Sequence, residues 1–188
     1  MTVKRRIPRR IEEIDWSDWE AVDKATLLFV RRDDELLLIR KRRGLGAGKI
    51  NAPGGRLDDG EKARDGAIRE VREEVCVTPI DPDHRGELLF QFVDGYSIHV
   101  WVYRTRDFEG EPTETHEAEP LWTRMDEIPF DAMWEDDKYW LPMLVRGERF
   151  QTKWIFDGDR MLDYEIETDG NIAPWGNIAV PGINGATS

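Results

Sequence analysis

Three glutamates within one short segment are the side chains of this chain best suited to chemistry. Glu70, Glu73 and Glu74 are spaced at i, i+3 and i+4, so a helix brings them onto one face. Carboxylates crowded in this way repel each other, and a divalent cation would neutralise them. Carboxylate oxygens with room for water are the ligands Mg²⁺ prefers when it carries a substrate phosphate. The segment therefore predicts a magnesium site on a helix; the alternative is a solvated, charge-laced surface helix.

The helix that positions these glutamates is expected at about residues 61–75, with Asp58 or Asp59 near its N-cap. A glycine-rich loop at 44–56 precedes it. The opposite face of the helix carries small and aliphatic side chains, namely Ala63, Ala67, Ile68, Val71 and Val75. This face can pack on a core, so the glutamates are expected to lie at the edge of a folded domain.

Apolar runs on both sides of this helix predict strands. Residues 25–32 and 35–41 are interpreted as one hairpin, and residues 86–93 and 97–104 as a second hairpin. The other expected elements are a loop at 78–84, a strand at 119–125, a helix at 136–146 that contains Pro142, and strands at 151–157 and 161–167. Strand pairs that alternate with two helices favour an α/β sandwich, with a mixed sheet between the helices.

The length and composition limit the class of protein. A chain of 188 residues suits one domain with an adequate core. No apolar run approaches the length of a membrane span, the N-terminus lacks the apolar core of a signal peptide, and one cysteine excludes an internal disulfide framework. We therefore expect a cytoplasmic protein with an N-terminal extension (1–24), a main domain (25–168) and an irregular tail (169–188).

The net charge of −12 argues against stable binding to nucleic acid or to an anionic membrane. Arginine far outnumbers lysine, and acidic residues outnumber both together, which is typical either of adaptation to high salt or of an ordinary acidic cytosolic protein. The first ten residues are basic by contrast. They could form a nucleic-acid or targeting arm, and a frayed or self-docking terminus is the simpler interpretation.

Residues 55–77 resemble the Nudix box, G-x5-E-x7-R-E-U-x-E-E-x-G-U, where U is aliphatic. The matching residues are Gly55, Glu61, Arg69, Glu70, Val71, Glu73, Glu74 and Val77. Cys76 stands where the motif has a glycine that ends the helix, so the exit turn could differ while every metal ligand is kept. The resemblance implies that Glu61 and Arg69 orient the loop and helix. It also implies that the three glutamates hold one to three Mg²⁺ ions, which Mn²⁺ can replace, with the Gly54 carbonyl as a further ligand. Glu117 would be a further metal ligand or a base; the simpler interpretation is a surface acid.

A closer resemblance extends over residues 25–167, to the MutT-type oxidised purine nucleoside triphosphatases of the animal kind. The stretches that carry it are RGLGAGKIN (43–51), GELLFQF (86–92), HVW (99–101) and IPFDAMWEDDKYWLPML (128–144). The resemblance implies Mg²⁺-dependent hydrolysis of 8-oxo-dGTP and 2-hydroxy-dATP to the monophosphate and pyrophosphate. Glu74 is the strongest single candidate for an essential residue.

The same resemblance implies a base pocket. Trp134 would stack on the purine, and Asn51 would supply a donor and an acceptor together. Asp136 and Asp137 would bind the Watson–Crick edge of the base. Adjacent carboxyls in a dry pocket repel, so one of them keeps its proton, and the pair then offers both a donor and an acceptor. The simpler interpretations are a core tryptophan, a turn asparagine and a helix N-cap. The remaining expected pocket residues are Thr26, Lys41, Leu45, Phe90 and Phe92.

Two positions depart from that branch. Leu45 stands where the family has a phenylalanine, and Ile50 where it has a tryptophan, so two aromatic walls are lost. The loss bears on affinity and on the preference for oxidised bases. Other functions therefore stay open: a Nudix hydrolase of ADP-ribose, a dinucleoside polyphosphate or ordinary nucleoside triphosphates, or an inactive nucleotide sensor. The expected partner is a small nucleotide, and the expected state is a monomer or a homodimer.

Overall fold

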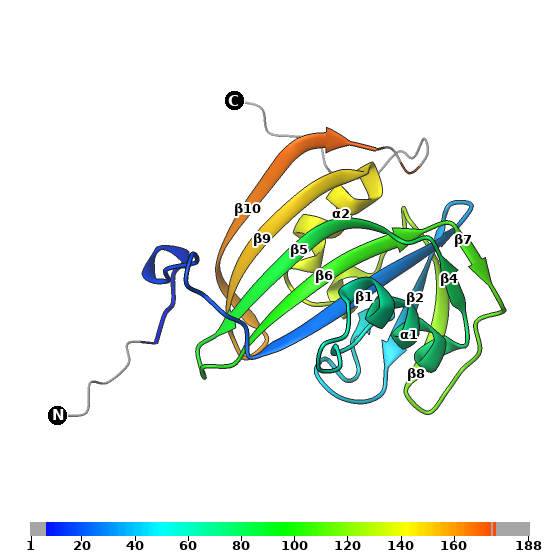
Figure 1. The fold of residues 1–188 in the computed structure, drawn as a ribbon, viewed down its shortest axis with the longest axis horizontal. Helices are drawn as coiled ribbons and strands as arrows, with labels where there is room; N and C mark the ends of the chain where they lie inside the picture. The colour runs from blue at the N-terminus through cyan, green and yellow to red at the C-terminus, as the bar shows by residue number, and fades with distance from the viewer. Residues whose placement is uncertain (1–6, 174, 176–188) are drawn as a thin grey trace.

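A mixed sheet forms the centre of the molecule in the computed structural model, which describes residues 7–173 and 175 (Figure 1). The sheet has eight strands in the order β10-β9-β5-β6-β1-β2-β3, with β8 paired to β2. Strands β1 and β6, and strands β5 and β9, run parallel, and the other pairs are antiparallel. The strands span β1 Asp23–Arg32, β2 Glu35–Lys41, β3 Ile50–Asn51, β4 Thr78–Ile80, β5 Asp83–Phe92, β6 Ser97–Thr105, β7 Asp107–Glu109, β8 Ala118–Arg124, β9 Glu148–Asp157 and β10 Arg160–Ile172.

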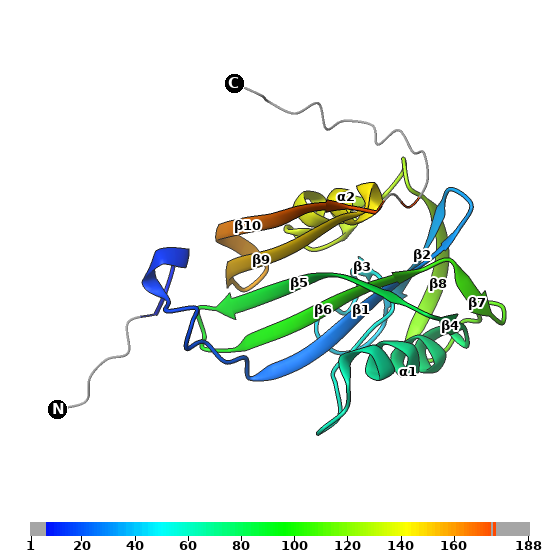
Figure 2. The same cartoon turned by 45° about the horizontal axis from the view of Figure 1, so that its top comes forward.

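Two helices lie on opposite faces of this sheet, α1 (Ala63–Val75) on one and α2 (Asp137–Arg146) on the other (Figure 2). Each helix packs on its own apolar core. The strand between the two cores is buried on both faces, which explains its continuous run of aliphatic side chains: Leu36 and Leu38 face the α2 core, and Leu37 and Ile39 face the α1 core. The predicted α/β sandwich with a mixed sheet is confirmed.

The sheet forks beside β1. Strand β1 pairs with β2 only from Val30 to Arg32. Along the N-terminal part of β1, the loop before α1 pairs with the strand in place of β2. There the Leu28 N–H donates to the Pro53 carbonyl and the Thr26 N–H donates to the Gly55 carbonyl, both at 2.9 Å. The loop thus reaches both faces of the sheet, and it connects the α1 side with the α2 side.

Three details differ from the sequence expectations. Helix α1 begins at Ala63, and its N-cap is Lys62 rather than Asp58 or Asp59. The two aspartates lie in a turn, in which Gly60 has a φ of 77° and the Glu61 N–H donates to the Asp58 carbonyl. That turn uses the backbone groups that a helix start at residue 61 would need.

A loop was expected at residues 78–84, but strand β4 occupies the first part of this range and pairs with β7. Pro79 is tolerated in β4 because this strand has a partner on one side only. At the other end of the chain, β10 continues to Ile172, three residues beyond the Asp169 from which an irregular tail was expected. Most of that tail, residues 174 and 176–188, lies outside the described residues.

The N-terminal segment packs against the far edge of the sheet. A 3₁₀ turn at Ile11–Glu13 buries Ile11, whose N–H donates to Asp163 of β10 at 2.9 Å. Arg9 forms an ion pair with Asp157 at 3.2 Å. Residues 9–11 therefore dock on the protein's own sheet; the basic residues before position 7 lie outside the described part. No helix of the described residues is long and apolar enough to cross a membrane.

Candidate active site

Helix α1 and the loop before it form an acidic site around one buried carboxylate. Glu74 is 3% exposed, and its Oε2 accepts a hydrogen bond from the Gly54 N–H at 2.8 Å. The Lys41 ammonium lies 3.7 Å from Glu74 Oε1 and 3.4 Å from the Gly54 carbonyl oxygen. A cation is thus already favoured between this carboxylate and this carbonyl, the two groups expected to share a metal ion.

Two glycines allow the loop to approach the helix this closely. Gly54 has a φ of 158°, and a Cβ there would clash with the Thr26 carbonyl. A Cβ at Gly55 would clash with the Glu70 carboxylate. The glycine pair therefore lets the backbone pass between β1 and the acidic face of α1.

Glu61 and Arg69 join the loop to the helix. The Arg69 guanidinium donates to both oxygens of Glu61 at 2.8 Å, and it donates to the Arg56 carbonyl at 3.0 Å. The guanidinium holds the pKa of Glu61 at about 2, so this carboxylate stays ionised. Arg69 also donates to Glu70 at 2.8 Å and to Glu73 at 3.0 Å. One arginine therefore orients three carboxylates.

The electrostatics of the site favour a bound cation. Burial raises the pKa of Glu74 to about 7, with the charges of Glu70 and Glu117 in the same direction and with Lys41 and the Gly54 N–H opposing. Burial also raises the pKa of Glu70. Keeping these carboxylates ionised at neutral pH therefore costs free energy, and a nearby positive charge lowers that cost.

The donor set fits a hard divalent cation. It consists of the oxygens of Glu70, Glu73, Glu74 and the Gly54 carbonyl, which are the ligands Mg²⁺ prefers. Within the described residues, however, no three carboxylate, imidazole or thiol groups already converge on one point. Arg69 and Lys41 hold these oxygens instead. Glu117 is half-exposed on the neighbouring loop, with His116 Nε2 at 3.2 Å.

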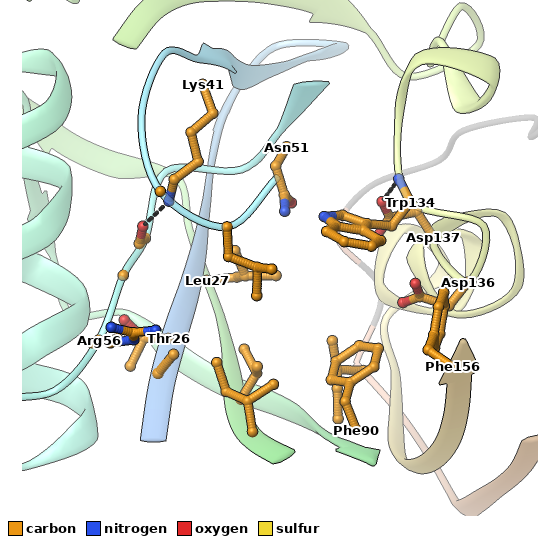
Figure 3. Close-up of a pocket in the computed structure, with 18 of the residues that line it drawn as sticks. Thr26, Leu27, Lys41, Asn51, Arg56, Phe90, Trp134, Asp136, Asp137 and Phe156 are labelled. Atoms are coloured by element: carbon orange, nitrogen blue, oxygen red, sulfur yellow. Dashed lines mark hydrogen bonds between the residues drawn. The ribbon is translucent and has the colours of Figure 1, made fainter. Parts of the chain in front are cut away.

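A cavity of ≈ 290 Å³ opens on the α2 face of the sheet and reaches the Gly54 loop (Figure 3). All of the residues predicted to bind a substrate line it: Thr26, Lys41, Leu45, Asn51, Phe90, Phe92, Trp134, Asp136 and Asp137. Gly54 and Gly55 line it as well. The structure thus brings together side chains that are up to 111 positions apart in the chain, from 26 to 137.

Two carboxyl groups lie at the α2 end of the cavity. Asp136 and Asp137 are each 2% exposed. Asp137 accepts a hydrogen bond from the Trp134 N–H at 2.9 Å, and Asp136 Oδ2 accepts one from Trp140 Nε1 at 2.8 Å. Asp136 Oδ1 has no partner in the described part of the protein. Burial raises the pKa of both carboxyls, and the charge of Asp136 raises the pKa of Asp137 further.

Trp134 faces into the cavity from the same end (Figure 3). It packs edge-on against Phe156, with ring centroids 6.0 Å apart, and the Lys49 ammonium lies 4.8 Å from its centroid. Gly46 permits this position, because a Cβ there would come within 2.9 Å of the indole nitrogen. Trp134 is therefore held at the cavity wall, partly buried against the core on the α2 side of the sheet.

Other predicted pocket residues differ in what they offer. Thr26 Oγ1 is buried and has no hydrogen-bond partner among the described residues. Asn51 lies in strand β3 and not in a turn; its Oδ1 accepts from the Ala52 N–H at 2.8 Å, and its amide N–H₂ remains as a donor. Leu45 is 48% exposed at the rim, whereas Ile50 is buried in the core and is not among the residues that line the cavity.

Several residues that line the cavity were not singled out from the sequence, among them Leu27, Arg56, Tyr96, Trp140 and Phe156. Leu27, Trp140 and Phe156 belong to apolar elements that give no sign of which face is a pocket. Arg56 directly follows the glycine pair, and Tyr96 follows the Asp-Gly turn of a hairpin, so their positions beside recognisable turns were the available signal.

The arrangement has the features of a nucleotide-cleaving enzyme: an aromatic pocket with two acids, joined through a glycine loop to a glutamate helix. Comparison with known proteins agrees. Residues 21–144 match the NUDIX domain. An oxidized purine nucleoside triphosphate hydrolase of Mus musculus is 38% identical over 144 residues, covering 75% of this chain and 92% of that protein. Its counterpart from Danio rerio is 37% identical over 145 residues, covering 76% and 92%.

A solved structure supports the same assignment. The MutT protein of Bacillus halodurans superposes with a TM-score of 0.70 at 25% sequence identity, covering 78% of this chain and 98% of that one. The chain therefore belongs to the Nudix hydrolase family, whose members generally use divalent metal cations.

Proposed function

We propose that this protein hydrolyses oxidised purine nucleoside triphosphates, 8-oxo-dGTP and 2-hydroxy-dATP, to the monophosphate and pyrophosphate. It would act on free nucleotides in the cytoplasm, with Mg²⁺ as cofactor, and keep damaged bases out of DNA. The observation that carries the proposal is a single cavity with the acidic pair at one end and the Gly54 loop at the other. The names of the mouse and zebrafish relatives support it.

The α2 end of the cavity suits an oxidised purine. Raised pKa values in the adjacent Asp136 and Asp137 mean that one carboxyl can be protonated while the other is ionised. Together they then offer one donor and one acceptor, which can match the edge of either an oxidised guanine or an oxidised adenine. Asp136 Oδ1 has no partner in the described residues, so a bound base would satisfy it.

The stacking surface at this end is the Trp134 indole. A stacked base gains roughly 1–3 kcal/mol. Removal of this ring therefore tests the base pocket separately from the acidic helix. We expect Trp134→Ala to raise KM for every purine nucleotide and to reduce the preference for the oxidised base.

The α1 end of the cavity suits a triphosphate. Glu70, Glu73, Glu74 and the Gly54 carbonyl would hold the divalent cation, with Glu117 as a further carboxylate from the next loop. A bound Mg²⁺ neutralises phosphate charge and lowers the pKa of water for attack on phosphorus. The protein's own contribution is orientation: the Gly54 N–H fixes one oxygen of Glu74, and Arg69 fixes Glu61, Glu70 and Glu73. Lys41 adds a positive charge where the loop and the helix meet.

The decisive experiment compares hydrolysis of 8-oxo-dGTP with that of dGTP, in Mg²⁺ and at low and high salt, by release of pyrophosphate. We expect kcat/KM to favour the oxidised base at least about tenfold, which is about 1.4 kcal/mol. Glu74→Gln should abolish most turnover with the fold intact, while Glu111→Gln, at an exposed loop position, should behave as the unchanged protein. Equal rates on both nucleotides would instead favour another nucleoside diphosphate derivative as the substrate.

A further inference from the structure

Three polar residues from separate parts of the chain meet at the rim of the cavity. Arg56 follows the glycine pair, Asp23 opens β1, and Tyr96 lies in the turn between β5 and β6. Arg56 Nε lies 2.9 Å from Asp23 Oδ2, and the Tyr96 hydroxyl donates to the same oxygen at 2.8 Å. Arg56 Nη2 also donates to the Tyr96 hydroxyl oxygen at 3.5 Å. The three side chains thus form a closed network, with the guanidinium as its outermost member.

The network holds the guanidinium at the surface without burying it. The Arg56 side chain is 65% exposed, whereas that of Asp23 is 27% exposed and Tyr96 is partly buried, with its ring 5.5 Å from that of Phe92. A guanidinium carries five N–H donors. Contacts within the network involve Nε and Nη2, and Nη1 has no partner in the described part of the chain. Arg56 therefore keeps donors for a ligand.

The position of Arg56 in the cavity indicates which part of a ligand it would meet. Figure 3 shows Arg56 beside Thr26, on the side of the cavity where α1 lies, with Trp134 and Asp136 on the opposite side. Among the described residues that line the cavity, the two basic ones are Lys41 and Arg56, and both lie toward α1. The opposite end of the cavity is lined by carboxyls and aromatic rings, and the Lys49 ammonium behind Trp134 already pairs with Asp159 at 3.1 Å, so that end would repel an anion or leave it unpaired. A negatively charged group of a ligand would therefore lie between Lys41 and Arg56.

We infer that Arg56 binds a phosphate group of the substrate, and that Asp23 and Tyr96 are positioning residues that hold its guanidinium at the cavity rim. The inference rests on the proposed function, because it takes the ligand to be a nucleoside triphosphate with its base at Trp134. A planar guanidinium matches two phosphate oxygens with two parallel hydrogen bonds, whereas an ammonium such as Lys41 acts as a point charge. Lys41 would contribute positive charge at the phosphate site, and Arg56 would also orient the phosphate.

The first test compares Arg56→Ala and Arg56→Lys with Arg64→Ala as a matched control. Arg64 is also an exposed arginine, in the first turn of α1, but it pairs with Asp81, which follows β4, and it does not line the cavity. For whichever nucleoside triphosphate the protein hydrolyses, Arg56→Ala should raise KM about ten- to hundredfold, with a smaller change in kcat. Arg56→Lys should recover part of this loss, and Arg64→Ala should leave KM unchanged.

The second test separates phosphate binding from a general effect on the pocket. Binding of the free nucleoside 8-oxo-deoxyguanosine, followed by tryptophan fluorescence, should be the same for the unchanged protein and for Arg56→Ala. Tyr96→Phe and Asp23→Asn should each raise KM for the triphosphate about three- to tenfold, and neither should add to the effect of Arg56→Ala in a double variant. That non-additivity distinguishes positioning from a purely structural role.

The outcomes separate this inference from the proposed function. If the unchanged protein prefers 8-oxo-dGTP but Arg56→Ala behaves as Arg64→Ala, the inference is overturned and the proposed function stands. An equal loss of nucleoside and triphosphate binding in Arg56→Ala would also overturn it. If the unchanged protein hydrolyses no nucleoside triphosphate, both fall together.

Discussion

Burial of two adjacent carboxyls makes the stability of this protein depend on pH at the level of single residues. Asp136 is 2% exposed, and burial raises its pKa above the usual value in the folded state. A carboxyl whose folded pKa is raised binds a proton that the unfolded chain releases. Its contribution therefore lowers the stability as pH rises from about 4 through the raised folded pKa, and the loss stops above that value.

We predict that Asp136→Asn is more stable than the unchanged protein at pH 8 by about 1–2 kcal/mol, and that the difference shrinks at pH 5. An amide cannot ionise, and its oxygen can still accept from Trp140 Nε1. Urea unfolding at both pH values measures the difference. Asp131→Asn, at an exposed position, is the control. The same pH dependence in Asp136→Asn and in the unchanged protein would contradict the assignment.

If the pair reads the base as proposed, the same substitution should reduce activity on the oxidised nucleotide, because an amide cannot alternate between a protonated and an ionised form. A gain in stability together with a loss of activity would indicate that the buried carboxyl lowers the stability of the fold and contributes to substrate binding. Either change alone would argue for a different role: a gain in stability without loss of activity would indicate a buried carboxyl with no part in base recognition.

At the scale of elements, the backbone at the C-terminal end of helix α1 is strained at the position where the Nudix box has a glycine. Cys76 stands where the Nudix box has glycine, yet it adopts the left-handed conformation that glycine favours, with φ 62° and ψ 22°. Its N–H still donates to the Arg72 carbonyl at 3.0 Å. The exit turn is therefore kept, and the side chain at this position bears the cost of about 1 kcal/mol.

We predict that Cys76→Gly stabilises the protein by about 0.5–1 kcal/mol, since glycine removes the steric cost at a positive φ but adds freedom to the unfolded chain. Thermal unfolding under reducing conditions measures the change. Cys76→Ala is the matched control, because it removes the thiol and keeps the Cβ, and its stability should stay close to that of the unchanged protein. A stabilisation by alanine as large as that by glycine would show that the thiol, and not the backbone, carries the cost.

Elements with a strong local pattern could be predicted from the sequence, and elements defined by distant partners could not. The glutamate spacing places α1 and its acidic face, and the aliphatic run at 36–39 places β2, because each pattern is set by its own residues. By contrast, β4 and β7 are three residues each and exist through pairing with each other. The start of α1 was misplaced because the competing turn at Asp58–Glu61 depends on Gly60.

The same limit applies to the candidate site. Trp134, Asp136 and Asp137 could be named through a resemblance over a long stretch, whereas chemistry alone favours a core tryptophan and leaves a helix cap open for either aspartate. The meeting of Arg56, Asp23 and Tyr96 depends on two separate pieces of backbone pairing: the loop after Gly55 lies along β1, and β1 runs parallel to β6. Neither pairing has a signature in the residues themselves, so the network could be seen only in the folded chain.

At the scale of the whole molecule, the excess of acidic residues sets how the fold responds to salt. The net charge is −12, and many of the ion pairs are at exposed positions, such as Arg124 with Asp34 and with Asp126. Exposed pairs contribute little each, so screening them costs little. Screening of the overall repulsion among the excess carboxylates favours the compact state. The second effect should outweigh the first.

We therefore predict that raising KCl from about 0.05 M to about 1 M at pH 7.5 stabilises the protein by about 1 kcal/mol, which raises Tm by about 2–4 °C for a chain of this size. The control is the same salt series at pH 5, close to the sequence pI of ≈ 4.8, where little net charge remains to be screened. A stabilisation confined to pH 7.5 would identify self-repulsion as the cause. An equal stabilisation at both pH values would show that salt acts on apolar burial instead, and it would remove the electrostatic argument for adaptation to high salt.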